Sequence, residues 1–326
     1  MKTIKEYSQL IDNALKDKQY GSYPKELYDP ISYVMSLGGK RLRPLLVLMG
    51  NDLFGGDTEK AIHPAIAIEL FHNFTLVHDD IMDKAPLRRN QTTVHKKWNE
   101  NVAILSADAM IVKAYQELCK ADFNFLPTLL DIFSDTALKV CEGQQLDMNY
   151  ETQTKVSILN YLKMIELKTA VLLGGSLKIG AILGGASQID SQTMYDFGKH
   201  VGIAFQLQDD ILDVFGDSEK FGKQKGGDII SNKKTYLLLK ALEMVEGNKY
   251  MKEELHLWIN APVFEPSEKV EAVTNIYNFL NVRELANKEM EKQYAIGMSL
   301  LNSLQVADDK KKNIINFTDS LMVREV

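Results

Sequence analysis

Two acidic motifs with the same spacing are the parts of this sequence best suited to do chemistry. HDDIMD occupies residues 78–83 and QDDILD occupies residues 208–213, and each places the pattern D-D-x-x-D after an apolar run with helical periodicity. On a helix, Asp79 and Asp83 share one face, and Asp80 lies about 100° round from Asp79. The three carboxylates therefore gather on one side of one helix end.

Like charges at this spacing repel each other, and the negative end of the helix dipole adds to the repulsion. A single such motif is also compatible with an ordinary solvated helix end, but two copies are harder to explain in that way. Carboxylate oxygens without a nearby cysteine suit Mg²⁺ or Mn²⁺. Because Mg²⁺ usually keeps sites for water and phosphate, the ligand set indicates a phosphorylated substrate.

The second motif repeats this geometry. Asp209 and Asp213 share a face with Asp210 beside them, and Gln206 falls on the same face one turn earlier. If the two clusters face each other, they form a jaw that can hold more than one ion.

Basic residues stand close to both motifs. GGKRLRP at 38–44 places three cations beside a flexible glycine pair, and Pro44 suits the first turn of a following helix. Arg88 and Arg89 follow the first motif after a short loop, and arginine binds phosphate through two parallel hydrogen bonds. These basic residues indicate a diphosphate site beside the metal, although a basic surface loop alone would look similar.

Further cations follow the second motif. FGKQKGGDIISNKKTYLL carries Lys223, Lys225, Lys233 and Lys234, which form either a surface loop or a lid that closes on phosphate. Lys168 interrupts an apolar helix and either reaches towards solvent or points into a polar cavity.

The elements that position these residues read as helix after helix, which predicts an all-α fold in one domain over residues 1–326. The apolar segment 169–187 is expected to be a buried core helix and not a membrane span, because Lys178 and five glycines interrupt it. The predicted breaks between helices are 38–44, 54–60, 84–91, 121–127, 149–154, 184–190, 216–234 and 260–267.

The bulk composition excludes several classes of protein. The net charge of −6 gives no overall attraction to nucleic acid or anionic lipid. Cys119 and Cys141 are too few for a disulfide framework, and the amphipathic N-terminus is unlike a signal peptide. We therefore expect a cytoplasmic protein without a membrane span and without a nucleic-acid partner.

The combination of motifs resembles the trans-isoprenyl diphosphate synthases, or polyprenyl synthetases. The matching stretches are GGKRLRP, FHNFTLVHDDIMD, LRRNQTTVH, ELKTAVL, GIAFQLQDDILD and FGKQKGGDIISNKKTYLL, in the family's order. The resemblance implies the isoprenoid synthase fold, with helices around a central active-site cavity, and a homodimer. It also implies the Mg²⁺-dependent condensation of isopentenyl diphosphate with an allylic diphosphate such as dimethylallyl, geranyl or farnesyl diphosphate.

The resemblance assigns roles residue by residue. It implies about three Mg²⁺ ions, with Mn²⁺ as a substitute. Direct metal ligands would be Asp79, Asp83 and Asp209, supported by Asp80, Asp210 and Asp213. The allylic diphosphate would be held by Arg88, Lys168, Gln206, Lys223 and Lys233, with Thr169 near the reacting centre. Isopentenyl diphosphate would be held by Lys40, Arg43, His72 and Arg89.

One departure concerns Asn90, which replaces a glycine of the family's RRGxxT pattern. We expect little effect, because asparagine tolerates the left-handed conformation. The first motif also lacks a two-residue insertion that is typical of bacterial farnesyl diphosphate synthases.

The length of the product depends on the floor of a tunnel below the first motif. The resemblance places this floor at Phe74, five residues before Asp79, whereas a helical wheel puts Phe71 and Thr75 nearer the carboxylate face. These aromatic residues could equally be ordinary core. We favour geranylgeranyl diphosphate over farnesyl diphosphate as the product.

Three other classes of protein share part of this pattern. A terpene cyclase of the same fold usually has a different second metal motif, and a non-catalytic subunit usually loses one cluster. A helical interaction protein needs no paired acidic clusters. Both motifs are intact, which favours the synthase.

Overall fold

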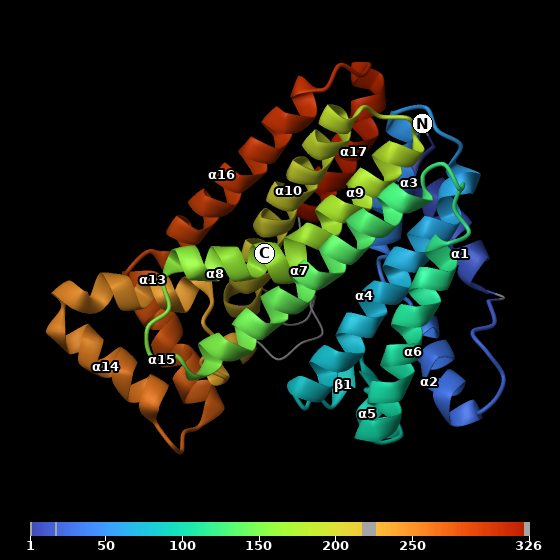
Figure 1. Ribbon diagram of the computed structural model, residues 1–326. Helices are drawn as coiled ribbons and strands as arrows, with labels where there is room; N and C mark the ends of the chain where they lie inside the picture. Colours follow the sequence, from blue (N-terminus) through green and yellow to red (C-terminus); the bar gives the residue numbers. More distant parts are fainter. Residues whose placement is uncertain (1, 17, 217–225, 323–326) are drawn as a thin grey trace. The chain divides into compact units, whose positions relative to one another are not determined.

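The computed structural model describes residues 2–16, 18–216 and 226–322. These residues are almost entirely helical, as the sequence predicts (Figure 1). The chain forms two compact units, which are described separately: unit 1 comprises Met1–Ala137, Leu173–Tyr195 and Ser303–Ile315, and unit 2 comprises Leu138–Leu172, Asp196–Asn302 and Asn316–Val326. The single domain expected for residues 1–326 remains a prediction.

Unit 1 contains the first acidic motif and is built from helices and one small hairpin. Its elements are α1 (Ile4–Lys16), α2 (Lys25–Ser36), α3 (Leu42–Leu53), the 3₁₀ turn Thr58–Ala61, α4 (Ile62–Met82), β1 (Leu87–Arg88), β2 (Gln91–Thr92), α5 (Val94–Lys97), α6 (Glu100–Leu118), α9 (Val171–Leu183), and the N-terminal parts of α7 (Leu126–Thr152), α10 (Gln188–Phe215) and α17 (Asp308–Met322).

The centre of unit 1 is α4, which packs along α6 (Figure 1). Residues 64–71 of α4 are all buried, and all of them except Glu69 are apolar. The facing side of α6 carries small residues, among them Ala103, Ala107 and Ala114, which allow a close approach. The N-terminus of α6 is capped by Asn99, whose side chain accepts a hydrogen bond from the backbone of Val102 at 2.9 Å.

The apolar segment expected at 169–187 is a buried helix, which confirms that prediction. Its residues 171–183 form α9, and α9 lies against α3. A Cβ atom on Gly180 would lie 2.1 Å from the carbonyl oxygen of Val47, so only glycine permits this contact. Among the residues that the structure describes, no helix has the length and apolar character needed to cross a bilayer.

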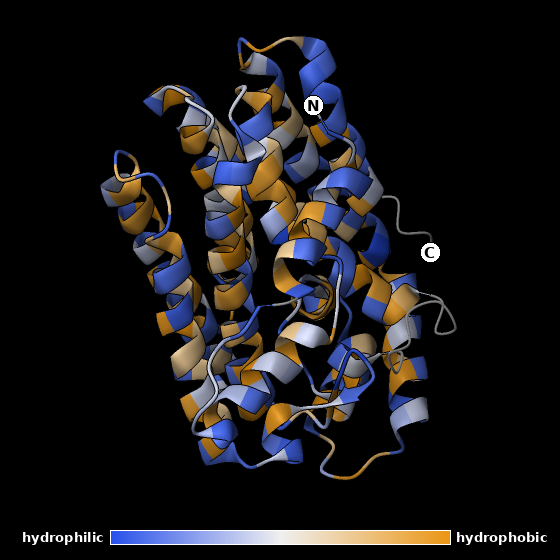
Figure 2. Ribbon diagram, turned by 90° about the vertical axis from the view of Figure 1, so that its right-hand side faces the viewer, coloured by the Kyte–Doolittle hydropathy of each residue, from blue (hydrophilic) through white to orange (hydrophobic). Residues whose placement is uncertain are grey.

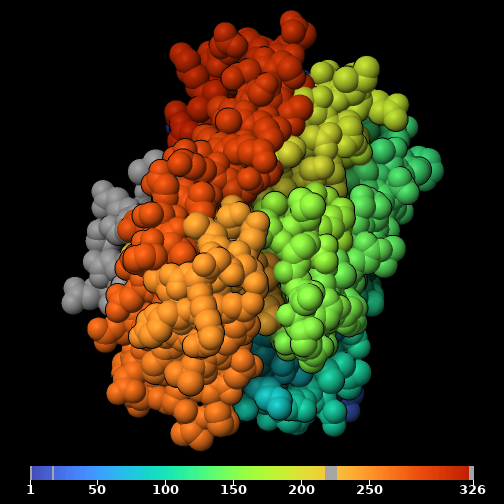
Figure 3. Space-filling view, turned by 90° about the vertical axis from the view of Figure 1, so that its left-hand side faces the viewer, coloured from blue at the N-terminus to red at the C-terminus, as the bar shows by residue number. Residues whose placement is uncertain are grey.

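Unit 2 contains the second acidic motif. Its elements are the C-terminal part of α7, α8 (Ile158–Ile165), the π-helix Glu166–Ala170, the C-terminal parts of α10 and α17, α12 (Gly227–Ile230), α13 (Tyr236–Met244), the 3₁₀ turn Val245–Gly247, α14 (Lys249–Asn260), α15 (Pro266–Phe279) and α16 (Val282–Ser303). Apolar and polar residues alternate with helical spacing along the helices of both units (Figure 2). In the space-filling view, the orange residues of α13–α15 form a continuous part of the surface (Figure 3).

Most of the predicted breaks are confirmed, and one is misplaced. The break predicted at 149–154 begins later, because α7 continues to Thr152. Further breaks, among them 18–24, Asn248, Asn281 and 304–307, were not predicted; the left-handed conformation of Asn281 ends α15. The part of the 216–234 break at residues 217–225 lies outside the described residues.

Candidate active site

The first acidic motif lies at the C-terminal end of α4, as predicted. Asp79 and Asp80 belong to the last turn, and Asp83 is the C-cap residue. Arg88 returns to this end from β1: its Nε donates to Asp80 Oδ1 at 2.7 Å and its guanidinium donates to Asp79 Oδ2 at 3.2 Å. Burial raises the pKa of the Asp80 carboxyl to about 6, although Arg88 acts in the opposite direction. Arg88 therefore already neutralises part of the acidic motif.

A tight hairpin carries Arg88 back to α4. Leu87 pairs with Thr92 and Arg88 pairs with Gln91, so the loop consists of Arg89 and Asn90 alone. Both loop residues have positive φ angles, 53° and 60°, as two-residue hairpins require. The expected left-handed conformation of Asn90 is thus confirmed, and asparagine serves here in place of glycine.

Arg89 contacts the glycine pair that precedes α3. Its guanidinium donates to the carbonyl of Gly38, and a Cβ atom on Gly39 would lie 2.8 Å from Arg89 Cζ. Gly39 also has a φ of +135°, so both its conformation and its neighbour require glycine. The GGKRLRP segment, with Lys40 exposed in it, is thereby joined to the hairpin.

Arg43 and His72 form a second pair in unit 1. Arg43 lies 3.1 Å from His72 Nε2, and because arginine can only donate, Nε2 must be the acceptor and the ring proton must sit on Nδ1. Burial and the charge of Arg43 hold the pKa of His72 well below its usual value. His72 is therefore neutral, and its ring is oriented by Arg43, another residue that was predicted to bind isopentenyl diphosphate.

Arg41 has a different role from its neighbours in the basic segment. Its guanidinium donates to Glu69 Oε1 at 2.5 Å and to the carbonyl of Met35 at 2.6 Å. Asn73 also donates to Glu69 Oε1, at 3.0 Å. The Arg41 and Glu69 side chains are only 8% and 2% exposed. This buried ion pair fixes the start of α3, where Arg41 itself has a positive φ of 48°.

The second acidic motif lies near the end of α10 in unit 2. The hydroxyl of Tyr161, a residue of α8, donates to Asp210 Oδ2, and Gln206 donates to Asp210 Oδ1 at 3.1 Å. Burial and the nearby charge of Asp228 raise the pKa of Asp210 to about 7. The sequence placed Gln206 on the face of Asp209 and Asp213, whereas its amide binds Asp210.

Asp213 holds the chain that follows the motif. Its Oδ2 accepts from the backbone of Asp228 at 3.0 Å, and its carbonyl accepts from the backbone of Gly226 at 2.8 Å. The backbone of Lys233 in turn donates to the carbonyl of Asp228 at 2.9 Å. Asp213 therefore brings Asp228 and the Lys233 segment to the second motif.

Lys168 and Thr169 lie in a π-helix, Glu166–Ala170, a form of helix that is frequent at functional sites. Gly143 of α7 permits the close approach to this π-helix, because a Cβ atom there would lie 2.2 Å from the backbone nitrogen of Lys168. Lys168 Nζ binds Asp147 at 2.6 Å, and Thr169 donates to Gln206 at 3.1 Å. The ammonium of Lys168 is thus paired with a carboxylate, at a side chain that is 23% exposed.

Each unit thus assembles its own part of the predicted site. Unit 1 joins Asp79 and Asp80 to Arg88, Arg43 to His72, and Arg89 to the glycine pair; unit 2 joins Thr169, Gln206 and Asp210. Lys223 lies outside the described residues.

Sequence reasoning assigned no role to the residues that complete unit 2, which are Asp147, Tyr161 and Asp228. The GGDII stretch could have identified Asp228 as a candidate site residue. Asp147 and Tyr161 can be recognised as site residues only once their helices are packed.

The residues predicted to set product length belong to an aromatic row in unit 1. The Phe74 ring lies 4.7 Å from the His78 ring and 5.7 Å from the Phe71 ring, and Phe71 meets Phe133 of α7 at 5.5 Å. Thr75 turns its hydroxyl back to the carbonyl of His72 at 2.8 Å. The row continues down α4 from the acidic motif.

The donor set is compatible with Mg²⁺. Both motifs offer carboxylate oxygens, and the raised pKa values of Asp80 and Asp210 mark places where a cation would favour the charged form. Within residues 2–16, 18–216 and 226–322, no three acidic, histidine or cysteine side chains surround one point as a ready metal cage.

Known proteins are similar to this chain in both fold and sequence. A crystal structure of a geranylgeranyl pyrophosphate synthase superposes with a TM-score of 0.95 at 43% identity and covers 100% of both chains. That of the geranylgeranyl pyrophosphate synthetase from Pyrococcus horikoshii gives 0.90 at 31% identity, covering 99% of this chain and 97% of the other. The geranylgeranyl diphosphate synthase of Methanosarcina mazei is 36% identical over 324 residues, which are 99% of this chain and 97% of that protein.

The fold and these structural neighbours define the chain as an all-α isoprenoid synthase. The family model for polyprenyl synthetase matches residues 24–278, and the chain belongs to that family. It is a prenyltransferase of the short-chain isoprenyl diphosphate synthase type.

Proposed function

We propose that the protein condenses isopentenyl diphosphate head to tail with an allylic diphosphate and releases diphosphate. The observation that carries this proposal is that both acidic motifs are complete and that each lies at a helix end beside polar partners suited to a diphosphate site. Family membership and the printed names of the similar proteins support the same reaction.

In this proposal each motif binds Mg²⁺ that carries substrate diphosphate. Asp79, Asp83 and Asp209 would bind about three Mg²⁺ ions, and Mn²⁺ would serve as a substitute. When bound, Mg²⁺ would neutralise the charge that grows on the leaving diphosphate. A structure with Mg²⁺ and pyrophosphate in which neither Asp79 nor Asp209 contacts the metal would contradict this role.

The protein's own residues would do the remaining work. Arg88, Lys168 and Lys233 would hold the allylic diphosphate while its C–O bond breaks. Arg43 and Arg89 would hold isopentenyl diphosphate, whose double bond attacks the allylic carbon. The proton lost in the final step would leave with the released diphosphate.

Lys40 and His72 would also contact isopentenyl diphosphate. Lys223 and Gln206 would contact the allylic diphosphate. The neutral His72 supports this role indirectly, because Arg43 keeps its full charge for the phosphate while the ring fixes its direction. Asp80, Asp210 and Asp213 would act mainly by holding Arg88, α8 and the Asp228 segment in place.

The product proposed for this chain is geranylgeranyl diphosphate. The similar proteins named above carry that product in their names, and the aromatic row below Asp79 offers bulky side chains at which growth can stop. The cytoplasmic location remains a prediction.

The protein is further proposed to be a homodimer that pairs through α6. Ile104, Leu105 and Val112 lie on one face of this helix and are 42%, 61% and 55% exposed. Apolar side chains grouped in this way favour association with a second copy. Light scattering should give twice the chain mass for the wild type and a single chain mass for Leu105→Glu; a monomeric wild type would contradict the proposal.

The reaction is tested with labelled isopentenyl diphosphate and each allylic primer in turn. We expect prenyl products with Mg²⁺ and none when Mg²⁺ is chelated, with geranylgeranyl diphosphate as the longest main product. Prenyl transfer that persists at full rate in a chelator would refute the metal role. Absence of any product with all primers would refute the function.

A further inference from the structure

Segment 226–233 contains Asp228 and Lys233, two residues that lie near the second acidic motif. On one side of the segment, Asp213 accepts hydrogen bonds from the backbone N–H groups of Gly226 and Asp228, at 2.8 and 3.0 Å. The outer side of the segment rests on α15. Gly226 has a φ of +74°, and a Cβ atom there would lie 2.7 Å from a methyl group of Val270. The segment is therefore enclosed between α10 and α15.

Lys269, next to Val270, is almost fully buried, with 1% of its surface exposed. Its ammonium group donates to Asn232 Oδ1 at 2.8 Å and to the carbonyl of Ile230 at 3.3 Å, and it lies 4.1 Å from the centre of the Phe264 ring. These partners are neutral oxygens and an aromatic face. Burial without an acidic partner lowers the pKa of Lys269.

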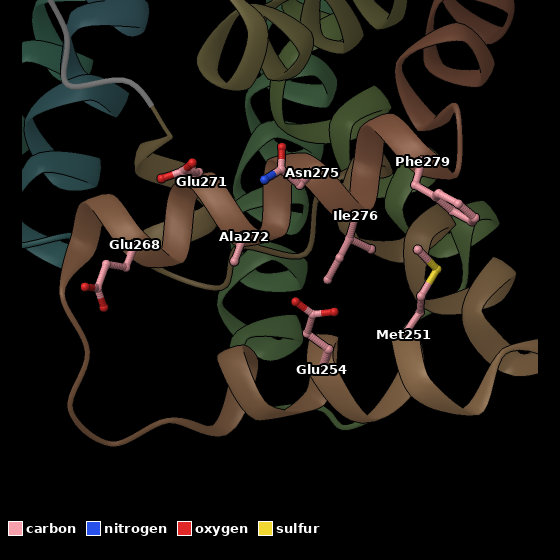
Figure 4. Close-up of a pocket in the computed structure, with 8 residues that line it drawn as sticks. All are labelled: Met251, Glu254, Glu268, Glu271, Ala272, Asn275, Ile276 and Phe279. Atoms are coloured by element: carbon pink, nitrogen blue, oxygen red, sulfur yellow. The ribbon is translucent and has the colours of Figure 1, made fainter.

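Asn232 extends this contact to α14. Its φ of +54° is left-handed, and while its Oδ1 accepts from Lys269, its Nδ2 donates to the carbonyl of Ile259 at 2.9 Å. The two helices leave a groove of about 420 Å³ between them, which is lined by Met251, Ile276 and Phe279 among others (Figure 4). Asn232 is thus a polar link between α14, α15 and the segment that leads into Lys233.

Packing alone does not explain a lysine at this position. A methionine has a similar length and volume and carries no charge to desolvate. What the ammonium adds is a pair of directed hydrogen bonds, to Ile230 and to Asn232, which lie three residues and one residue before Lys233. We propose that Lys269 is a positioning residue that holds segment 226–233 so that Lys233 can reach a diphosphate, an inference that rests on the proposed function.

The kinetic test compares Lys269→Met, Asn232→Leu and the double variant. We expect each single change to raise the KM for the allylic diphosphate about tenfold, with kcat and the KM for isopentenyl diphosphate within about twofold of wild type. The double variant should be less impaired than the sum of the two single changes, because the contact between Lys269 and Asn232 is lost in each of them. Lys240→Met is the matched control, since Lys240 of α13 donates to Glu243 at 2.9 Å and should leave all constants unchanged.

A second measurement does not depend on activity. Hydrogen exchange of the amides in 226–233 should be faster in Lys269→Met than in the wild type or in Lys240→Met. Unchanged exchange in this segment would overturn the proposal, as would equal rises in the KM of both substrates. If the wild type transfers no prenyl group, the proposed function fails, and the exchange measurement still decides whether Lys269 holds the segment.

Discussion

Replacing Phe74 by alanine should lengthen the product by about one isoprene unit. Phe74 lies five residues before Asp79, about 7.5 Å back along the axis of α4. It is 9% exposed, and its ring lies between His78 at 4.7 Å and Phe71 at 5.7 Å. Removing the ring would open a space that ends at Phe71.

The position of Phe71 limits the gain. Phe71 is three residues further from the acidic motif, about 4.5 Å along the helix, a distance comparable to the added length of one isoprene unit. It is 1% exposed and is backed by Phe133 at 5.5 Å. A growing chain that passes position 74 should therefore stop at the Phe71 ring.

The change also affects stability, because Phe→Ala in a core typically costs about 3–5 kcal/mol. The assay must be run well below the melting temperature, with helical content checked by circular dichroism. Products made from labelled isopentenyl diphosphate are dephosphorylated and separated by reversed-phase chromatography.

The control is Thr75→Val, which keeps the side-chain shape and removes only a hydroxyl that binds the helix's own backbone. It should leave the products unchanged. A folded Phe74→Ala enzyme with wild-type products would refute the reasoning and place the floor of the tunnel at another residue, such as Phe71 or Thr75.

Three further predictions concern the acidic motif and two buried ion pairs. Asp79→Ala should lower kcat by orders of magnitude, by about 10²-fold or more, with unchanged circular dichroism, and near-normal turnover would contradict a metal role. Glu69→Gln should cost about 3–5 kcal/mol in urea unfolding because it leaves Arg41 buried without its carboxylate; a loss below about 1 kcal/mol would show that the pair contributes little. For Glu117, burial is outweighed by hydrogen bonds from Lys120, Lys18 and His63, which lower its pKa from 4.5 to about 2. Its stabilisation is present above pH 4.5 and is lost as the pH falls through 2, so Glu117→Gln should cost about 1–2 kcal/mol at pH 7 and less at pH 3. Equal costs at both pH values would refute this assignment.

The sequence by itself determined the helical fold and the chemical character of the site. The 3.6-residue period and the paired D-D-x-x-D motifs are local patterns, so they place Asp79, Asp83, Asp209 and Asp213 at helix ends without knowledge of packing. The conformation of Asn90 was predictable for the same reason, because a turn residue's preference is local.

Tertiary structure decided which polar groups meet. Nothing local distinguishes Arg41 from Arg43, yet α4 offers Glu69 to one and His72 to the other. Tyr161 and Lys269 likewise read as a core aromatic and a surface lysine until packing brings them to Asp210 and Asn232. Such contacts join residues far apart in the chain, so their geometry depends on how helices pack and not on the spacing within any one helix.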